Sequence, residues 1–309
     1  MTWDRVERLI GSENLKRLAQ KRVGIVGLGS GGGFVAQSLA MSGVGGFVLI
    51  DDDTLEKHNV VRHVCDLRDV GRPKVEAVAD LIRQRNPEAR VETHIGRVED
   101  HVEALDNLDL LIVGVDGEGV KYIINQACLT RDLVAIYAGV YERGEGGDVV
   151  TIHPYDGPCY ACWAAALREG MQFEDLGDLD YGMIGPEGTL EAEPALWLHV
   201  VRVASVQTDF AIKELLREAD DHLPLPANTI ILANSALEII DGQESPPHSS
   251  LWVNVPRDPE CLVCGDQMRA AAQSSASTDQ QQSLDELMHQ TGMEMQQEDD
   301  RDQQQVNGE

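Results

Sequence analysis

Between two apolar segments the chain reads Gly27-Leu28-Gly29-Ser30-Gly31-Gly32. The apolar run at 22–27 predicts a short buried strand, and the pattern at 31–41 predicts a helix. Glycines at such a turn let the backbone approach phosphate groups closely, while the helix N-terminus supplies amides and a partial positive charge. The glycines Gly27, Gly29 and Gly32 therefore predict a nucleotide-binding loop in preference to a tight turn without a ligand.

Strands and helices alternate through the first half of the chain. Further strands are expected at 46–51, 90–95, 109–115 and 133–139, and further helices at 3–20, 72–85 and 119–131. This alternation is typical of βαβ units. We therefore predict an α/β fold with a doubly wound, Rossmann-like, mostly parallel sheet.

The pattern changes after Gly147, which separates a nucleotide-binding part at about 20–147 from a second part at about 148–266 of the same domain. The second part is expected to extend the sheet in antiparallel fashion, with strands at 148–153, 229–233 and 251–255 and a helix at 194–218. The segment 168–193 shows little periodicity, as in functional lids or crossing loops. Residues 267–309 predict a disordered, acidic, Gln-rich tail with a transient helix at about 284–288.

The charge and the apolar runs disfavour several classes of protein. The chain has 309 residues and a formal net charge of −28, and it has no basic cluster to displace counterions from nucleic-acid phosphates. Its longest apolar runs are strand-sized, and its first residues lack the apolar core of a signal peptide, so we expect a cytoplasmic protein that does not enter a membrane. The acidic excess fits a salt-rich cytoplasm and an acidic mesophile equally well.

The polar residues after the second strand exceed what a dinucleotide site requires. Asp51 ends that strand, where a carboxylate can hold ribose hydroxyls. A plain dinucleotide site would make the chain an NAD-dependent oxidoreductase, but it would not explain Asn59, Arg62 and Lys74. These three residues indicate chemistry at the phosphates of the nucleotide.

The segment 51–63, with its Asp-x-Asp and Asn-x-x-Arg spacing, resembles the ThiF/MoeB/HesA superfamily, the adenylating relatives of ubiquitin-activating enzymes. Gly71-Arg72-Pro73-Lys74 resembles the Gly-x-Pro-Lys element of that family. Asp116 stands where the family has a strand-end aspartate, and Arg8 resembles its N-terminal arginine. The resemblance covers roughly 3–266. It is imperfect at His63, where many members have Gln, and at Ser30, which replaces a common glycine.

This resemblance implies an ATP-dependent adenylyltransferase that activates the C-terminal glycine carboxylate of a small ubiquitin-fold or sulfur-carrier protein. Asp51 would hold the ribose, Asp116 would ligate Mg²⁺, and the triphosphate would be held by Asn59, Arg62 and Lys74. Arg8 would reach the site of a neighbouring subunit, which implies a homodimer. A carboxylate is already ionised at neutral pH, so the reaction requires positioning and charge neutralisation rather than a strong base.

Four of the six cysteines form two Cys-x-x-Cys pairs, Cys159 with Cys162 and Cys261 with Cys264. Two such pairs complete a closed tetrahedron, which predicts structural Zn²⁺ ahead of a redox pair or four independent thiols. No cysteine lies between the pairs, where family members that transfer the activated protein to their own thiol have the acceptor. The reaction is therefore expected to end at the acyl-adenylate or at an external acceptor. Cys128 is expected to be a small buried residue. Cys65, close after Arg62, is a weaker candidate for a reactive thiol, and a structural role is preferred for it.

Three rival functions remain open at this stage. One is a member of the same superfamily that acts on a small molecule or on tRNA, such as the dehydratase that cyclises a threonylcarbamoyl group. Another is a peptide adenylator of the microcin type, which would need an added peptide-clamp domain. The third, from another class, is an NAD-dependent oxidoreductase. ATP binding without NAD binding would exclude it.

Overall fold

The computed structural model describes residues 3–170, 195–240 and 243–275. The chain divides into two compact units, 1–266 and 267–309. The first unit contains the whole sheet and is described first. Most of the predicted crossing loop at 168–193 and the predicted helix at 284–288 lie outside the described residues.

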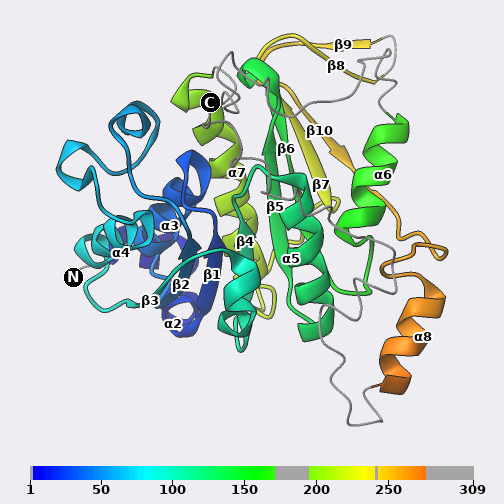
Figure 1. Ribbon diagram of the computed structural model, residues 1–309, viewed down its shortest axis with the longest axis horizontal. Coiled ribbons are helices and arrows are strands. Elements are labelled where there is room, and N and C mark those ends of the chain that lie inside the picture. The colour runs from blue at the N-terminus through cyan, green and yellow to red at the C-terminus, as the bar shows by residue number, and fades with distance from the viewer. Residues whose placement is uncertain (1–2, 171–194, 241–242, 276–309) are drawn as a thin grey trace, which may run out of the picture. The chain divides into compact units, whose positions relative to one another are not determined.

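An eight-stranded sheet with the order β10-β7-β6-β5-β4-β1-β2-β3 forms the centre of the first unit (Figure 1). Its strands are β1 (Arg22–Val26), β2 (Gly46–Asp51), β3 (Arg90–Ile95), β4 (Leu110–Val113), β5 (Ala135–Val140), β6 (Gly146–Ile152), β7 (Thr229–Ala233) and β10 (Ser250–Val253). A separate hairpin is formed by β8 (Leu237–Ile240) and β9 (Gln243–Ser245), which the sequence pattern did not predict.

The sheet has a parallel and an antiparallel half. Strands β3, β2, β1, β4 and β5 pair in parallel, whereas β6, β7 and β10 add to them in antiparallel register. The predicted α/β fold with a mostly parallel sheet and an antiparallel extension is therefore confirmed. In the parallel half, the carboxyl ends of adjacent strands meet at one edge, which is where ligands bind in open α/β sheets.

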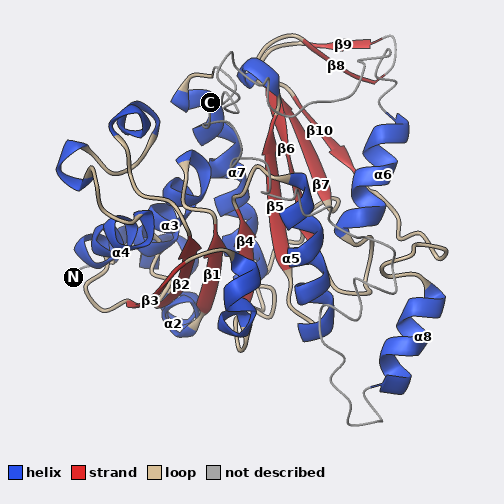
Figure 2. Cartoon of the chain, viewed as in Figure 1, coloured by secondary structure: helices blue, strands red, loops and turns tan. Residues whose placement is uncertain are grey.

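Helices cover both faces of the sheet (Figure 2). One apolar core joins the sheet to α2 (Ser12–Gln20), α3 (Ser30–Met41), α4 (Lys74–Arg85) and α7 (Trp197–Leu215). A second core lies on the opposite face and joins the sheet to α5 (Glu118–Arg131), α6 (Tyr160–Gly170) and the 3₁₀ segment η3 (Val98–Leu105). Burial of apolar surface on both faces explains why the central strands are apolar throughout instead of alternating. Among the residues that the structure describes, no helix is long and apolar enough to span a bilayer.

The N-terminal helix predicted at 3–20 is two helices, α1 (Asp4–Ile10) and α2. Gly11 separates them with φ of 81°, a backbone conformation that interrupts a helix and that glycine adopts without strain. A periodicity of apolar residues continues across such a break, so the pattern alone could not reveal it. In the second unit, the helix α8 (Asp266–Ser275) occupies the start of the segment for which a disordered tail was predicted.

Candidate nucleotide site and cysteine cluster

The glycine loop closes tightly over the carboxyl ends of β1 and β4. Gly27 has φ of 84°, and a Cβ atom there would lie 2.7 Å from the backbone of Gly114. A Cβ on Gly32 would lie 1.9 Å from the carbonyl oxygen of Gly27. A Cβ on Gly29 would meet nothing within 4 Å. Two of the predicted glycines are therefore required by the backbone itself, whereas Gly29 borders open space at the start of α3.

Asp51 anchors this loop from the end of β2. Its carboxylate accepts a hydrogen bond from the backbone N–H of Leu28 at 2.6 Å and another from that of Asp53 at 2.9 Å. Burial raises the pKa of Asp51, while the bond from Leu28 and the charge of Lys74 oppose this rise. Because the register pairs Val26 of β1 with Ile50 of β2, the carboxylate is presented directly to the turn.

His63 holds the same loop from its other side, a role that the sequence analysis did not assign to it. Its Nδ1 accepts a hydrogen bond from the backbone N–H of Cys65 at 3.0 Å, so the proton must be on Nε2, which donates to the carbonyl of Leu28 at 2.7 Å. Burial lowers the pKa of His63 and favours this neutral form. The departure from the family's glutamine was the only signal in the sequence, and a glutamine amide offers the same donor and acceptor.

The segment after Asp51 folds back so that Lys74 lies beside Asp53. Thr54 forms an antiparallel bridge with Pro73, and the backbone N–H of Lys74 donates to the carbonyl of Asp53 at 2.9 Å. The ammonium group of Lys74 pairs with the Asp53 carboxylate at 2.5 Å, although the lysine is only 8% exposed. This short ladder fixes one predicted phosphate ligand close to the end of β2.

Asn59 and Arg62 lie on the 3₁₀ helix η1 (Lys57–Arg62). The side-chain oxygen of Asn59 accepts a hydrogen bond from the backbone N–H of Glu56 at 2.8 Å and thereby caps that helix. Arg62 is half-buried and forms no hydrogen bond or ion pair with any described residue. A guanidinium group without a protein partner is available to a phosphate.

Asp116 lies in the loop after β4, separated from Val113 by Gly114 and Val115, and is exposed. Val26 of β1 pairs with Val113 of β4, and the backbone N–H of Gly114 donates to the carbonyl of Val26 at 2.8 Å. The loop that carries Asp116 therefore begins against the glycine loop. Arg8 differs from the other predicted residues, because it lies exposed on α1 and pairs with Asp4 of the same helix.

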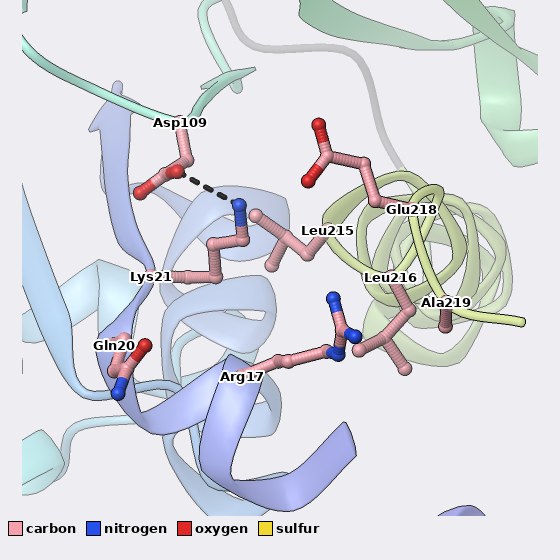
Figure 3. A pocket seen from close by; sticks show the side chains of 8 residues that line it. All are labelled: Arg17, Gln20, Lys21, Asp109, Leu215, Leu216, Glu218 and Ala219. Atoms are coloured by element: carbon pink, nitrogen blue, oxygen red, sulfur yellow. Dashed lines mark hydrogen bonds and ion pairs between the residues drawn. The ribbon is translucent and has the colours of Figure 1, made fainter. Parts of the chain in front are cut away.

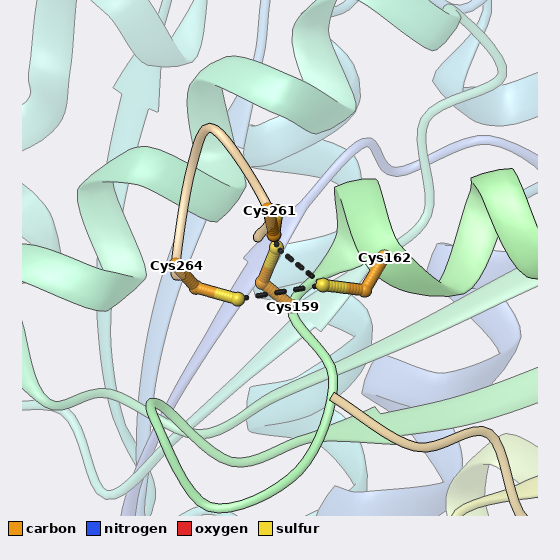
Figure 4. Close-up of side chains that lie close together, drawn as sticks. All are labelled: Cys159, Cys162, Cys261 and Cys264. Carbon is orange, nitrogen blue, oxygen red and sulfur yellow. Dashed lines mark hydrogen bonds between the residues drawn. The ribbon is translucent and has the colours of Figure 1, made fainter. Parts of the chain in front are cut away.

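The four predicted cysteines converge, although about a hundred residues separate the two pairs (Figure 4). All four sulfur atoms lie within 4.8 Å of one another. The Sγ–Sγ distances are 3.8 Å for Cys159–Cys162, 3.8 Å for Cys159–Cys261 and 3.4 Å for Cys162–Cys264. Tetrahedral zinc with bonds of about 2.3 Å would place its sulfur ligands about 3.8 Å apart. The cluster therefore fits a closed zinc site, as predicted, in which no position is left for a substrate.

Burial raises the pKa of cysteines inside the cluster and outside it. Contacts with Cys162 and Cys264, together with burial, raise the pKa of Cys159. A bound cation would offset the free-energy cost of ionising this thiol. Burial raises the pKa of Cys65 and of Cys128 to about 12. Neither of these two buried thiols supplies a thiolate at neutral pH, in agreement with the structural role expected for them.

A pocket of about 340 Å³ lies at the opposite edge of the sheet (Figure 3). Lys21, which precedes β1, pairs across it with Asp109 at 2.9 Å. Its other lining residues are Arg17, Gln20, Leu215, Leu216, Glu218 and Ala219. This pocket is at the amino ends of the parallel strands, so it is separate from the edge that carries the glycine loop.

A model of the ThiF family matches residues 4–247. The chain belongs to the ThiF family. The SAMP-activating enzyme E1 of Haloferax volcanii is 36% identical over 157 residues, which cover 50% of this chain and 57% of that protein. The adenylyltransferase and sulfurtransferase UBA4 of Lodderomyces elongisporus is 33% identical over 176 residues, which cover 55% of this chain and 38% of that protein. The matched part thus spans roughly half the length of these curated relatives.

Solved structures show the same fold. The crystal structure of E. coli MccB with ATP matches with a TM-score of 0.65 and 22% identity, covering 85% of this chain and 75% of that one. This ThiF-family chain therefore shares its fold with an experimentally determined structure. In this chain, that fold carries the glycine loop and the aspartates Asp51 and Asp116 that follow neighbouring strands.

Proposed function

We propose that this ThiF-family chain is an ATP-dependent adenylyltransferase that activates the C-terminal glycine carboxylate of a ubiquitin-fold or sulfur-carrier protein. The observation that carries the proposal is the meeting of the glycine loop, Asp51 and the Asp116 loop at one edge of the sheet. A dinucleotide site would use the first two and leave Asp116 and Arg62 without a role. The names of the relatives, which activate SAMP proteins or adenylate and transfer sulfur, support this reaction class.

Asp51 retains the capacity to bind ribose. Each of its carboxylate oxygens accepts one backbone hydrogen bond and keeps a second lone pair for a ribose hydroxyl. The two backbone bonds also hold the carboxylate rigid. ATP would thus meet a carboxylate that is already oriented, so binding would require little reorganisation.

The triphosphate would lie between the amides at the start of α3 and the cations of the segment 57–74. The N-terminus of α3 favours negative charge, and open space at Gly29 allows phosphate to approach. Arg62 has no competing partner among the described residues, and Asn59 still has its amide N–H groups available. Lys74 would exchange its contact with Asp53 for a phosphate oxygen.

In the proposed reaction a carboxylate oxygen of the substrate attacks the α-phosphorus, an acyl-adenylate forms and pyrophosphate leaves. No proton has to be removed, so the side chains contribute orientation and compensation of the charge that gathers on the leaving pyrophosphate. Asp116 would hold Mg²⁺, which favours carboxylate and phosphate oxygens and supplies further charge neutralisation. Arg8 of a second subunit would complete the site in a homodimer.

The acyl-adenylate would pass to an acceptor outside this chain. No cysteine lies in the sequence between Cys162 and Cys261. The remaining thiols, Cys65 and Cys128, are buried with raised pKa values. A sulfur donor, a protein amine or an external thiol would each suit this role.

The test is ATP–pyrophosphate exchange in high salt with Mg²⁺, with and without candidate ubiquitin-fold proteins that end in glycine. Wild type is compared with Asp116→Ala and with Asp100→Ala, which removes an exposed aspartate from η3. We expect exchange that requires the carrier, is retained in Asp100→Ala and falls by at least about a hundredfold in Asp116→Ala.

Two other outcomes are informative. ATP binding without exchange for any carrier would contradict the proposed substrate and favour a small-molecule or tRNA-linked carboxylate. Failure to bind ATP, or preferential binding of NAD, would contradict adenylation itself.

A further inference from the structure

Tyr160 connects the cysteine cluster to the helix that follows Asp116. It stands between Cys159 and Cys162 in the sequence and is 2% exposed. Its hydroxyl donates to the carboxylate of Glu118, with distances of 3.1 Å and 3.2 Å to the two oxygens. Glu118 is the first residue of α5, two positions after Asp116. The side chain of Tyr160 thus links the cysteine segment to the first turn of α5.

The surroundings of Tyr160 leave it no freedom to move. Its backbone N–H donates to the side-chain oxygen of Asn125, a buried residue of α5, at 2.9 Å. Its ring stacks on Tyr137 of β5 with centroids 4.6 Å apart, and Tyr122 of α5 meets it edge-on at 5.4 Å. The position of the hydroxyl is therefore set by the cysteine segment together with β5 and α5.

The Tyr160 contact lies in the first turn of α5. Gly117 occupies the N-cap position, so no side chain caps the helix there. Glu118 instead receives the Tyr160 hydroxyl and the ammonium group of Lys121, the latter at 3.0 Å. A carboxylate in the first turn is also favoured by the helix dipole. Since Asp116 itself forms no hydrogen bond or ion pair with any described residue, its position follows from where this turn begins.

We propose that Tyr160 is a positioning residue: its hydroxyl bond to Glu118 holds the start of α5, and thereby Asp116, in the geometry that binds Mg–ATP. This inference rests on the proposed function, in which Asp116 ligates the Mg²⁺ that accompanies ATP. The cysteine cluster then contributes to nucleotide binding as well as to stability, because it fixes the residue that fixes Asp116.

The test uses the full chain loaded with zinc and a double-mutant cycle of Tyr160→Phe and Glu118→Ala. Phenylalanine keeps the ring packing and removes only the hydroxyl. Zinc content is measured for each variant, and the dissociation constant for ATP is measured by calorimetry with and without Mg²⁺. Tyr122→Phe is the matched control, because that ring packs on Tyr160 from the edge.

We expect each single variant to bind Mg–ATP about tenfold more weakly, as for the loss of a hydrogen bond to a charged group. The double variant should be no weaker than Glu118→Ala alone, since that substitution already removes the contact that Tyr160→Phe removes, together with the ion pair to Lys121. Binding of ATP without Mg²⁺, zinc content and the Tyr122→Phe control should match wild type. A structural role alone would not confine the loss to the Mg²⁺-dependent part of binding.

The inference is overturned if zinc-loaded Tyr160→Phe binds Mg–ATP as wild type does, or if the two substitutions act additively. Should Tyr160→Phe fail to fold, Glu118→Ala is compared with Lys121→Ala, which removes the ion pair to Glu118 but keeps the Tyr160 hydroxyl contact. Equal losses of Mg–ATP binding in these two variants would overturn the inference. Wild type that binds no ATP would contradict the proposed function itself. Wild type that binds Mg–ATP with unaffected variants would contradict only the role of Tyr160.

Discussion

At the scale of single residues, the glycines of the loop have different physical reasons for being glycine. Gly32 is required because its neighbour's carbonyl oxygen would lie 1.9 Å from a Cβ. A Cβ on Gly29 would have no neighbour within 4 Å, so a side chain there would clash only with a bound ligand. The sequence pattern treats the two positions as equivalent. The structure indicates that Gly32 is needed for folding of the turn and that Gly29 leaves room for a ligand.

We therefore expect Gly32→Ala and Gly29→Ala to fail in different ways. Gly32→Ala should lower the melting temperature, because the turn between β1 and α3 must open to admit the methyl group. Gly29→Ala should melt within a degree or two of wild type and bind ATP at least tenfold more weakly. Thermal unfolding and ATP titration of both variants check this contrast. Normal ATP binding by Gly29→Ala would show that phosphate does not approach this position.

A second residue-scale feature is Asp148 of β6, a buried carboxyl that the sequence analysis did not single out. Burial raises its pKa from 3.8 to about 6, although the charge of Lys121 opposes the rise. The folded chain then holds the proton more tightly than the unfolded chain does. The stabilisation by the neutral form is complete below about pH 3 and is lost as the pH rises through 6.

Comparison of wild type with Asp148→Asn isolates this effect, because the amide cannot ionise. The stability of wild type relative to the variant should fall by about 3 kcal/mol between pH 3 and pH 7, following about 1.4 kcal/mol for each pKa unit. Urea unfolding of both proteins across that range measures the difference. Parallel stability curves would mean that Asp148 titrates normally.

At the scale of elements, α7 ties together two adjacent strands of the parallel half of the sheet. Gln207 is buried, and its side-chain N–H groups donate to the carbonyls of Val113 and Ile136, at 3.1 Å and 2.9 Å. These carbonyls belong to the adjacent strands β4 and β5. Val113 is the last residue of β4, so this contact secures the strand end from which the Asp116 loop departs.

Gln207→Leu should destabilise the fold by about 2 kcal/mol, because it leaves two buried carbonyls without this donor while filling a similar volume. Hydrogen exchange should speed up most at the ends of β4 and β5. Thr208→Val on the same helix is the control, since its hydroxyl bonds only to Ala204 within α7 at 2.8 Å, and it should cost less than about 1 kcal/mol. Equal effects from both substitutions would argue against a specific role for Gln207.

At the scale of the whole molecule, the net charge of −28 opposes folding through self-repulsion. Added salt should therefore raise the melting temperature, with much of the gain between about 0.1 M and 1 M KCl, where the screening length falls from about 10 Å to about 3 Å. A variant with three exposed acids neutralised, Glu88→Gln, Asp100→Asn and Glu103→Gln, should show a smaller rise. A melting temperature that salt leaves unchanged would show that repulsion contributes little.

Much of the fold and of the site follows from local pattern. Alternating apolar segments predicted the strands and helices of the parallel half, because burial on both faces demands them. The glycine loop and Asp51 were predicted from residue type and spacing, because a phosphate-binding turn requires glycines and a ribose requires a carboxylate at a strand end. The roles of Asn59, Arg62, Lys74 and Asp116 were implied by the resemblance to the family, and they stay predictions. The cysteine spacing predicted a cluster, because four thiolates suffice for a metal. The break at Gly11 and the hairpin β8–β9 were not predicted, because each involves too few residues to change the periodicity of apolar residues along the chain.

Contacts between residues far apart in the chain were decided only when the strands assembled. Nothing in the sequence indicates that His63 holds the carbonyl of Leu28, or that the hydroxyl of Tyr160 reaches Glu118. The same is true of Asp148, whose raised pKa comes from burial between β6 and α5. Spacing along a chain selects residue types for a chemistry. The direction in which a side chain points, its burial and its hydrogen-bond partner depend on which elements pack together, and this packing is decided only in the tertiary structure.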